Sequence, residues 1–166
     1  MANEDYIIRP AEIEDLHQVM RINQKTLPEN YPYSFFVELL KKFPKSFLVA
    51  EKNGEVLGYM MNRIEKGLPG VFTSHFRANK GHIVSIAVLP EHRRKGIGKR
   101  LMIEGMKAMK EYGAEEFVLE VRITNEPALA MYKSLGFEVV REIKGYYHDG
   151  ESAYLMSRKA EDIQIS

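Results

Sequence analysis

The sequence predicts one domain of the α/β class, with about seven strands in a mixed sheet and four helices. Three observations favour this class. The 166 residues, 45% of them hydrophobic, suit a single domain with a substantial core. Apolar residues recur at strand spacing in some segments and at helix spacing in others. An Asn-Gly pair between two apolar runs predicts an antiparallel hairpin. We expect the domain to span residues 1–157, followed by a C-terminal tail over 158–166.

The first part of the chain predicts a strand and then two helices. Residues Tyr6–Arg9 alternate like a short strand. The segment 11–23 has apolar residues at helical spacing, namely Ile13, Leu16, Val19 and Met20. The stretch "LPENYP" at 27–32 has two prolines and predicts a structured loop, and the Phe- and Leu-rich run after it predicts a short second helix.

Two neighbouring antiparallel strands are expected next. Asn53 and Gly54 stand between the apolar runs 46–52 and 55–64, which is the strongest short hairpin signal in a sequence. The following segment, Lys66–Lys80, is polar and rich in glycine and proline. We interpret it as a mobile loop, with a longer hairpin as the alternative.

The second half begins with a strand over residues 82–89, which is rich in β-branched residues and ends at Pro90. A helix is predicted over Gly98–Tyr112, with Gly113 after its end. Four residues form the apolar face of this helix: Leu101, Met102, Met106 and Met109. Residues 115–123 then predict another strand.

The last third predicts a short helix and two strands. Asn125 is the expected N-cap of the helix, Pro127 lies in its first turn, and Gly136 follows its end. The segments 136–147 and 151–159 read as two final strands joined by the turn His148–Glu151.

Composition excludes several classes of protein. Lys and Arg number 24 against 23 Asp and Glu, so the chain has no overall positive field for nucleic acid. The absence of cysteine excludes disulfides, thiolate zinc sites and thiol catalysis, and it suits a reducing compartment. The N-terminus is acidic and no apolar run is long enough to span a membrane. We expect a cytoplasmic protein without membrane or nucleic-acid partners.

The stretch "RRKGIG", residues Arg93–Gly98, concentrates cations at a strand-to-helix turn. A helix N-terminus presents unpaired backbone N–H groups, and glycines let that backbone approach an anion. Two nucleotide motifs fail here. A P-loop requires glycine at 93 and Ser or Thr at 100, and a dinucleotide motif requires glycine at 101. The segment therefore predicts a short anion cradle, although a solvated basic face would have the same composition.

These residues resemble the GNAT family of N-acetyltransferases. Arg93–Gly98 is similar to the family motif (Gln/Arg)-x-x-Gly-x-(Gly/Ala), and "NEPALAMYKSLGF" at 125–137 is similar to its second signature. Within the family, "LPENYP", "GHIVSIAV" and "GYYHDGESAYLM" resemble segments of the catalytic subunits of archaeal NatA-type protein N-terminal acetyltransferases. The resemblance covers nearly the whole chain. It implies the GNAT fold, with a mostly antiparallel sheet splayed at its two central strands.

The resemblance also implies acetyl-CoA as the cosubstrate. Its pyrophosphate would lie on the backbone amides of the cradle, and its pantetheine arm would run beside residues 86–88. Asn125 would contact the cofactor, and the Tyr132 hydroxyl would protonate the leaving thiolate. Asn125 is also a plain helix cap, and a half-buried core tyrosine is the alternative for Tyr132. The expected cofactor-binding residues are Ile86, Ala87, Val88, Arg93, Arg94, Lys95, Gly96, Ile97, Gly98, Lys99, Asn125 and Tyr132.

The acceptor amine needs a base, and the sequence offers three candidates. His82 and Glu120 each interrupt an apolar pattern on a predicted strand, so the two could share a water that relays a proton. They could instead be a structural polar couple or bind a metal, but two ligands make a poor site. Glu29 in "LPENYP" is the third candidate, by resemblance. Tyr31 and Tyr147 would wall the peptide site, although both could be packing residues.

The resemblance favours acetylation of protein N-termini that begin with small residues such as Ser or Ala, or with Met. Protein N-terminal peptides are then the substrates, and an auxiliary subunit or the ribosome is a candidate partner. Two other functions stay open: acetylation of a lysine or small amine by the same fold, and a non-catalytic module that binds CoA or a partner. A module of the last kind has no need of Tyr132, Glu120 and His82.

Overall fold

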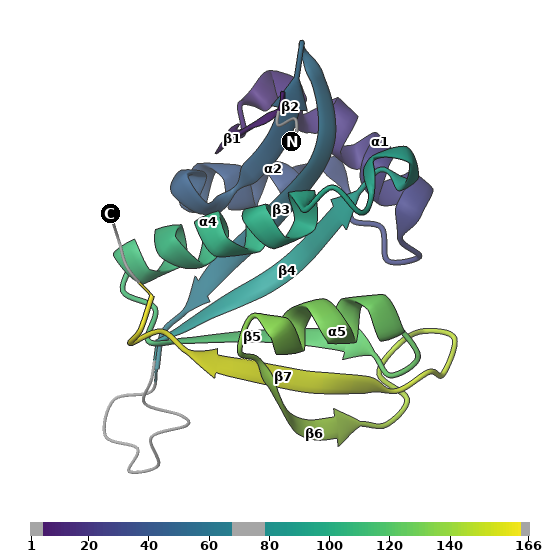
Figure 1. Ribbon diagram of the computed structural model, residues 1–166, viewed down its shortest axis with the longest axis vertical. Helices are drawn as coiled ribbons and strands as arrows, with labels where there is room; N and C mark the ends of the chain where they lie inside the picture. Colours follow the sequence, from purple (N-terminus) through teal and green to yellow (C-terminus); the bar gives the residue numbers. More distant parts are fainter. Residues whose placement is uncertain (1–4, 68–78, 164–166) are drawn as a thin grey trace.

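The computed structural model describes residues 5–67 and 79–163. Within these ranges, seven strands form one sheet in the order β1-β2-β3-β4-β5-β7-β6, and four α-helices pack on its two faces (Figure 1). The strands are β1 (Ile7–Pro10), β2 (Leu48–Lys52), β3 (Glu55–Glu65), β4 (Lys80–Val88), β5 (Glu116–Arg122), β6 (Glu138–Ile143) and β7 (Ala153–Lys159). The helices are α1 (Leu16–Thr26), α2 (Tyr33–Lys42), α4 (Ile97–Glu111) and α5 (Glu126–Ser134).

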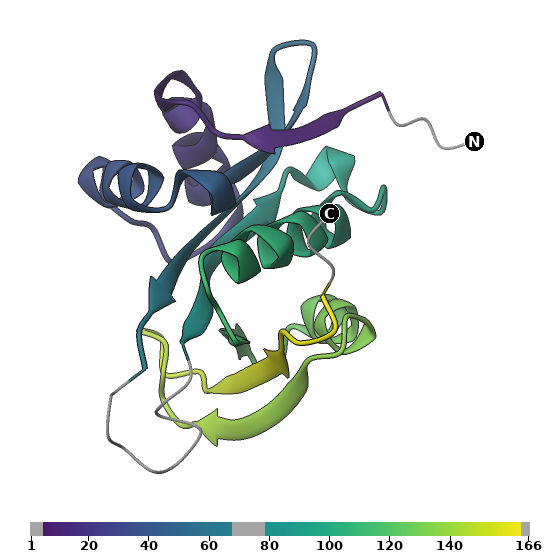
Figure 2. The ribbon, with the colours of Figure 1, turned by 90° about the vertical axis from the view of Figure 1, so that its left-hand side faces the viewer.

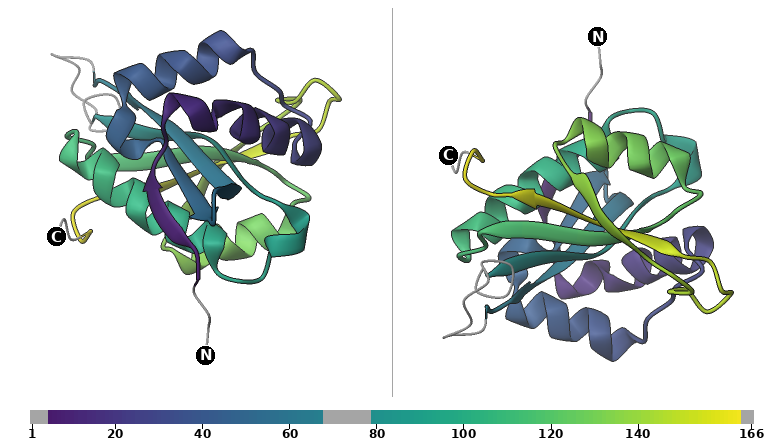
Figure 3. Two further views of the ribbon diagram at one scale, coloured as in Figure 1. Left: turned by 90° about the horizontal axis from the view of Figure 1, so that it is seen from above. Right: turned by 90° about the horizontal axis from the view of Figure 1, so that it is seen from below.

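The sheet separates two apolar layers. Helices α1 and α2 cover one face and α4 and α5 the other, as the views from above and below make clear (Figure 3). The four residues predicted for the apolar face of α4 are all buried against the sheet: Leu101, Met102, Met106 and Met109. The helical spacing read from the sequence therefore identified this part of the core correctly.

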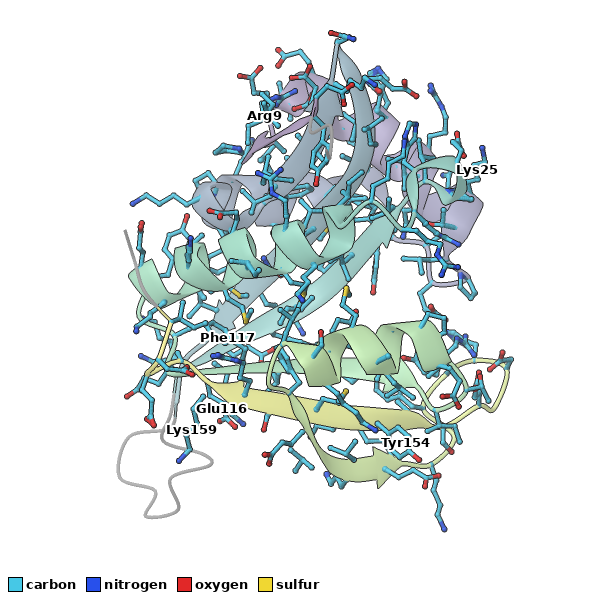
Figure 4. The ribbon with its side chains drawn as sticks, in the orientation of Figure 1. Arg9, Lys25, Glu116, Phe117, Tyr154 and Lys159 are labelled. Atoms are coloured by element: carbon cyan, nitrogen blue, oxygen red, sulfur yellow. The ribbon has the colours of Figure 1, made fainter. Side chains whose placement is uncertain are left out.

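The β2–β3 hairpin is confirmed. Asn53 and Gly54 have φ values of 51° and 84°, the left-handed pair that a tight two-residue turn requires. This hairpin and the β6–β7 pair lie at opposite ends of the molecule (Figure 2). Strands β5 and β7 pair antiparallel, with Glu116 opposite Lys159, and these two labelled residues lie together in Figure 4.

Strands β4 and β5 are the parallel pair of the sheet, and they separate soon after they meet. Their pairing covers Lys80↔Glu116, Gly81↔Phe117 and His82↔Val118. Beyond His82 the strands diverge towards their carboxyl ends (Figure 1). The expected splay at the central strands is therefore present. Because ladder partners are missing there, backbone groups of both strands face the opening.

Some boundaries differ from the sequence prediction. Strand β6 ends at Ile143, whereas the predicted strand continued to Tyr147. Residues 144–152 form a loop instead, since Gly145 takes a φ of 64°, and the Tyr147 N–H bonds to the Glu151 carbonyl at 3.1 Å. The expected turn at His148–Glu151 lies inside this loop. The first helix begins at Leu16, after a 3-10 turn over Ile13–Asp15, and not at residue 11.

The segment predicted as a mobile loop connects two antiparallel neighbours, because Glu65 on β3 pairs with Lys80 on β4. Residues 68–78 lie outside the described residues, so both the mobile loop and the longer hairpin stay predictions. The domain limit at residue 157 stays a prediction: β7 runs to Lys159, and Ala160 is buried. No helix in the described ranges is long and apolar enough to cross a membrane.

Candidate functional site

The splay between β4 and β5 opens a cleft of about 1450 Å³. Its walls are the carboxyl half of β4, the start of α4, helix α5, the loop at 27–31 and the loop at 146–148. Every site residue expected from the sequence lines this cleft except Lys95, whose Nζ lies 3.2 Å from Nδ1 of His92. Segments far apart in sequence thus meet around one opening.

One end of the cleft carries the predicted anion cradle. Gly96 is the N-cap of α4 with a φ of 79°, a conformation that favours glycine. The Arg100 N–H makes a helical bond to the Gly96 carbonyl at 3.0 Å, so the N–H groups of the three preceding residues start the helix without such a partner. Those three, Ile97, Gly98 and Lys99, line the cleft. The positive end of α4 therefore points at this space.

The cations of the cradle have different environments. Arg93 is turned towards the strand end, since its Nε donates to the Val88 carbonyl at 3.1 Å. Arg100 stacks over the ring of Tyr6 at 5.0 Å. Arg94 has a φ of 65° and lines the cleft together with Lys99. Arg94 and Lys99 are therefore the cations most directly presented to a bound anion.

Helix α5 forms the opposite wall. Asn125 caps the helix, with its Oδ1 accepting from the Ala128 N–H at 3.3 Å, which confirms the predicted N-cap. Tyr132 is 7% exposed, and its ring lies 6.0 Å from that of Phe137. Burial raises the pKa of Tyr132 to about 12, so its hydroxyl stays protonated at neutral pH and can donate a proton into the cleft.

His82 is held between two carboxylates. Its Nε2 lies 2.8 Å from Oε1 of Glu120, and its Nδ1 lies 2.8 Å from Oε2 of Glu65. The sequence predicted the approach of His82 to Glu120 but with a water between them, and the contact is direct. Glu65 was not anticipated. It stands at the end of β3, the strand next to β4, so its reach to His82 depends on the register of that pair.

This arrangement determines the charge of His82. A carboxylate only accepts hydrogen bonds, so an imidazole that contacts one through each nitrogen carries both protons. Burial lowers the pKa of His82, but the hydrogen bonds to Glu120 and Glu65 outweigh burial and raise it to about 9. The hydrogen bond to His82 lowers the pKa of Glu65 to about 2. Among the described residues no group of three side chains could hold a metal ion.

Arg122, at the end of β5, connects the loop at 27–31 with the loop at 144–152. Its Nη2 donates to Oε2 of Glu29 at 2.6 Å, and its Nη1 contacts Asp149 at 3.0 Å and Glu151 at 2.7 Å. Its guanidinium also lies 4.1 Å from the ring centre of Tyr147. The sequence analysis missed this residue, although a cation directly after the apolar alternation of β5 was a signal.

The two aromatic walls are fixed in different ways. Tyr31 packs on Phe35, with ring centres 5.0 Å apart, and on Phe36 at 6.2 Å. Tyr147 lies against Tyr146 at 4.9 Å as well as against Arg122. Burial raises the pKa values of Tyr31 and Tyr147, and the negative charge of Glu29 adds to the effect at both. Both hydroxyls are therefore hydrogen-bond donors at neutral pH.

Comparison with known proteins agrees with this geometry. The model of the acetyltransferase (GNAT) family matches residues 16–137. An N-alpha-acetyltransferase of Sulfurisphaera tokodaii is 53% identical over 155 residues, which cover 93% of each chain. The N-terminal acetyltransferase A complex catalytic subunit ard1 of Schizosaccharomyces pombe is 35% identical, over 91% of this chain and 84% of that protein.

A solved structure shows the same architecture. The crystal structure of Chaetomium thermophilum Naa20 in complex with a bisubstrate analogue superposes with a TM-score of 0.82 at 34% identity, covering 92% of this chain and 86% of the other. The family resemblance read from the two sequence motifs and the fold expected from it are both confirmed. A cradle at the start of α4, a cleft between splayed strands and these relatives lead to one conclusion: the chain belongs to the acetyltransferase (GNAT) family.

Proposed function

We propose that this protein is a protein N-terminal α-amino acetyltransferase that transfers the acetyl group of acetyl-CoA directly to the first amine of a polypeptide. The observation that carries the proposal is the 53% identity, along nearly the whole chain, to a protein named N-alpha-acetyltransferase. The cleft supports it, since its lining includes both the start of α4, which suits phosphates, and Tyr31 and Tyr147, which suit a peptide.

The donor half of the cleft suits the phosphorylated end of CoA. The N–H groups of Ile97, Gly98 and Lys99 would hold the pyrophosphate at the positive end of α4. Residues 86–88 of β4 would run beside the pantetheine arm, with a backbone N–H of Ile86 or a neighbour on the thioester carbonyl. Asn125 and Tyr132 would contact the cofactor from α5.

The reaction would proceed by direct attack. The amine nitrogen bonds to the thioester carbonyl carbon, and the C–S bond breaks when the tetrahedral intermediate collapses. The Tyr132 hydroxyl gives its proton to the departing thiolate. The amine loses one proton to a carboxylate, which returns it to Tyr132 through solvent. Acetylated amine and CoA thiol leave, so protons and electrons balance.

Glu120 is the best-placed carboxylate for the amine proton. His82 has no free ring nitrogen while it is bound by two carboxylates. Oε2 of Glu120 makes no hydrogen bond to any described residue, and Glu120 lines the cleft. Glu29 is paired with Arg122 at 2.6 Å, which suits a residue that orients the peptide. We assign Glu120 as proton acceptor, through a water, and Glu29, Tyr31 and Tyr147 as peptide-binding residues.

A terminal amine fits such a base better than a lysine does. An unperturbed α-amino group has a pKa of about 8, and a lysine about 10.4, so a lysine is harder to deprotonate by roughly two powers of ten. Lysine or small-amine acetylation by the same fold is the alternative, and a non-catalytic CoA-binding module is the second alternative. Both are outcomes of the experiment below.

The partners follow from the relatives. The relative from Schizosaccharomyces pombe is named as the catalytic subunit of a complex, so an auxiliary subunit is a candidate partner of this chain as well. Association with the ribosome would bring the site to nascent N-termini that begin with Ser, Ala or Met. The cytoplasmic location expected from the sequence stays a prediction.

The test is CoA release from acetyl-CoA with three peptides. The first has a free Ser or Ala terminus and no lysine, the second is the same peptide blocked at its N-terminus, and the third is blocked but contains lysine. We expect turnover of the first peptide alone. Turnover of the lysine peptide alone would support the first alternative. No turnover, together with CoA binding, would support the non-catalytic module.

A further inference from the structure

A hydrogen-bonded network of three polar side chains crosses the apolar layer between the sheet and helices α1 and α2. Asn23 of α1 is 1% exposed, Tyr59 of β3 is 0% exposed and Ser85 of β4 is 6% exposed. Asn23 Nδ2 donates to the Tyr59 hydroxyl at 3.2 Å, and that hydroxyl lies 2.6 Å from Ser85 Oγ. Burial raises the pKa of Tyr59 to about 12, so its hydroxyl is protonated, and either this hydroxyl or that of Ser85 is the donor between them.

The Asn23 end of this network holds the loop at 27–32. Asn23 Nδ2 also donates to the backbone carbonyl of Glu29 at 3.0 Å. Asn30, from inside the loop, donates to Asn23 Oδ1 at 3.3 Å and to the Leu27 carbonyl at 3.0 Å. The position of the Glu29 backbone is therefore set by a buried side chain and not by regular secondary structure.

The Ser85 end holds β4 at the place where its ladder is irregular. Ser85 pairs with Met61, but the next pair is Asn62↔Ile83, so Val84 bulges without a partner. Ser85 and Glu29 both line the cleft. The three side chains thus join two walls of one cleft: the strand beside the expected thioester and the loop beside the expected acceptor amine.

Burying three polar side chains is not needed for packing. Phenylalanine has the shape of Tyr59 without its hydroxyl, and an alanine at 85 would remove the partner of that hydroxyl, so an apolar core could fill the same space. A buried hydrogen-bonded network does fix relative positions, because each polar group must keep its partner to avoid the cost of an unsatisfied buried group. The network is therefore better explained by the relative positions it fixes than by a contribution to the stability of the fold.

We propose that Asn23, Tyr59 and Ser85 are positioning residues that fix the acceptor loop at 27–32 relative to strand β4. The proposal rests on the function proposed above. The network acts on the peptide side of the cleft, because its loop end carries Glu29 and Tyr31, whereas the phosphate cradle is on α4. Breaking it changes how the peptide is held and leaves CoA binding intact.

The test uses Y59F, S85A and the double variant. Loss of one hydrogen bond corresponds to about a 2- to 12-fold change in an equilibrium, so we expect kcat/KM for the peptide to fall by that factor through a higher peptide KM. The dissociation constant of CoA, measured by calorimetry, should change by less than twofold. Because Y59F and S85A remove the same hydrogen bond, kcat/KM for the peptide should fall no further in the double variant than in Y59F alone.

The matched control is Y112F. The Tyr112 hydroxyl accepts a hydrogen bond from the Lys45 N–H at 2.9 Å, far in sequence from the acceptor loop. A purely structural role would give Y59F and Y112F similar losses in melting temperature and no change in peptide KM. That result, or an equal weakening of CoA binding in Y59F, would overturn the proposal.

Hydrogen exchange separates this inference from the proposed function. The backbone amides of Leu27 and of residues 29–31 should exchange faster in Y59F and S85A than in the wild type and in Y112F, with no substrate present. If the wild type acetylates no N-terminal peptide but this difference is found, the function is wrong and the positioning stands. Unchanged exchange in both variants overturns the positioning whatever the activity.

Discussion

Replacing Glu65 with glutamine tests the charge of His82 most directly. The pKa of His82 rises from 6.5 to about 9 although burial lowers it, so the two carboxylates together raise it by more than the net change. If they contribute equally, each accounts for more than half of the rise. We therefore expect E65Q to bring the pKa of His82 below about 8, since one carboxylate must then oppose the same burial.

The effect on stability has a definite pH dependence. A histidine whose pKa is higher in the folded protein stabilises it fully below pH 6.5, and this stabilisation is lost as the pH rises through 9. Half of the rise corresponds to about 1.7 kcal/mol at 1.36 kcal/mol per pKa unit. Because the Glu65 side chain is 41% exposed, screening reduces this to roughly 1 kcal/mol. E65Q should therefore lower the free energy of unfolding by about 1 kcal/mol at pH 6 and by almost nothing at pH 10.

The assay is an NMR titration of the five histidine rings, with the His82 signal assigned by its absence in H82Q. Urea unfolding at pH 6 and at pH 10 gives the stabilities. The control is E104Q, which removes a carboxylate from a half-buried pair with Lys107 on α4 and should leave the His82 titration unchanged. A wild-type His82 pKa near 6.5, or an identical value in E65Q, would refute the doubly bonded imidazolium.

Three further variants address the cleft. Y132F should lower kcat by at least about 10²-fold in steady-state assays, the usual lower range for loss of an acid catalyst. A loss below threefold would mean that another group protonates the thiolate. G96A places a side chain at a φ of 79°, so it should destabilise the protein by about 1 kcal/mol and weaken CoA binding. The control G113A, with a φ of 99° beyond the other end of α4, should destabilise the protein without weakening CoA binding. Equal CoA affinities of the two variants would show that the cradle does not hold the cofactor. R122M removes the ion pairs of Arg122 with Glu29, Asp149 and Glu151, so it should raise the peptide KM several-fold in steady-state assays. An unchanged KM would show that the acceptor loops hold their positions without Arg122.

Much of the fold could be read from local patterns. The Asn53-Gly54 turn, the Asn125 cap and the apolar stripe of α4 are each determined by residues within a few positions of one another. The errors fall where local patterns compete with loop conformations. Tyr146 and Tyr147 look like the end of a strand, but Gly145 turns the chain away from the sheet before them.

The site was recognised only in part, for a physical reason. The cradle and the residues of α5 belong to continuous motifs, and a motif is visible in a single sequence. Glu65 and Arg122 act through contacts with residues 17 or more positions away, so their importance depends on strand register and loop packing. The direct contact of His82 with Glu120 likewise required β4 and β5 to meet at His82↔Val118.

The sequence by itself determined the family, the order of elements and the position of the glycine-containing start of α4 that we propose as the phosphate cradle, because each depends on short segments with their own conformational preferences. The tertiary structure decided the charge of His82, the pairing of Glu29 with Arg122, and the link from Asn23 through Tyr59 to Ser85. Protonation and side-chain orientation depend on the distance to groups from other strands and loops, and those distances exist only once the sheet has assembled.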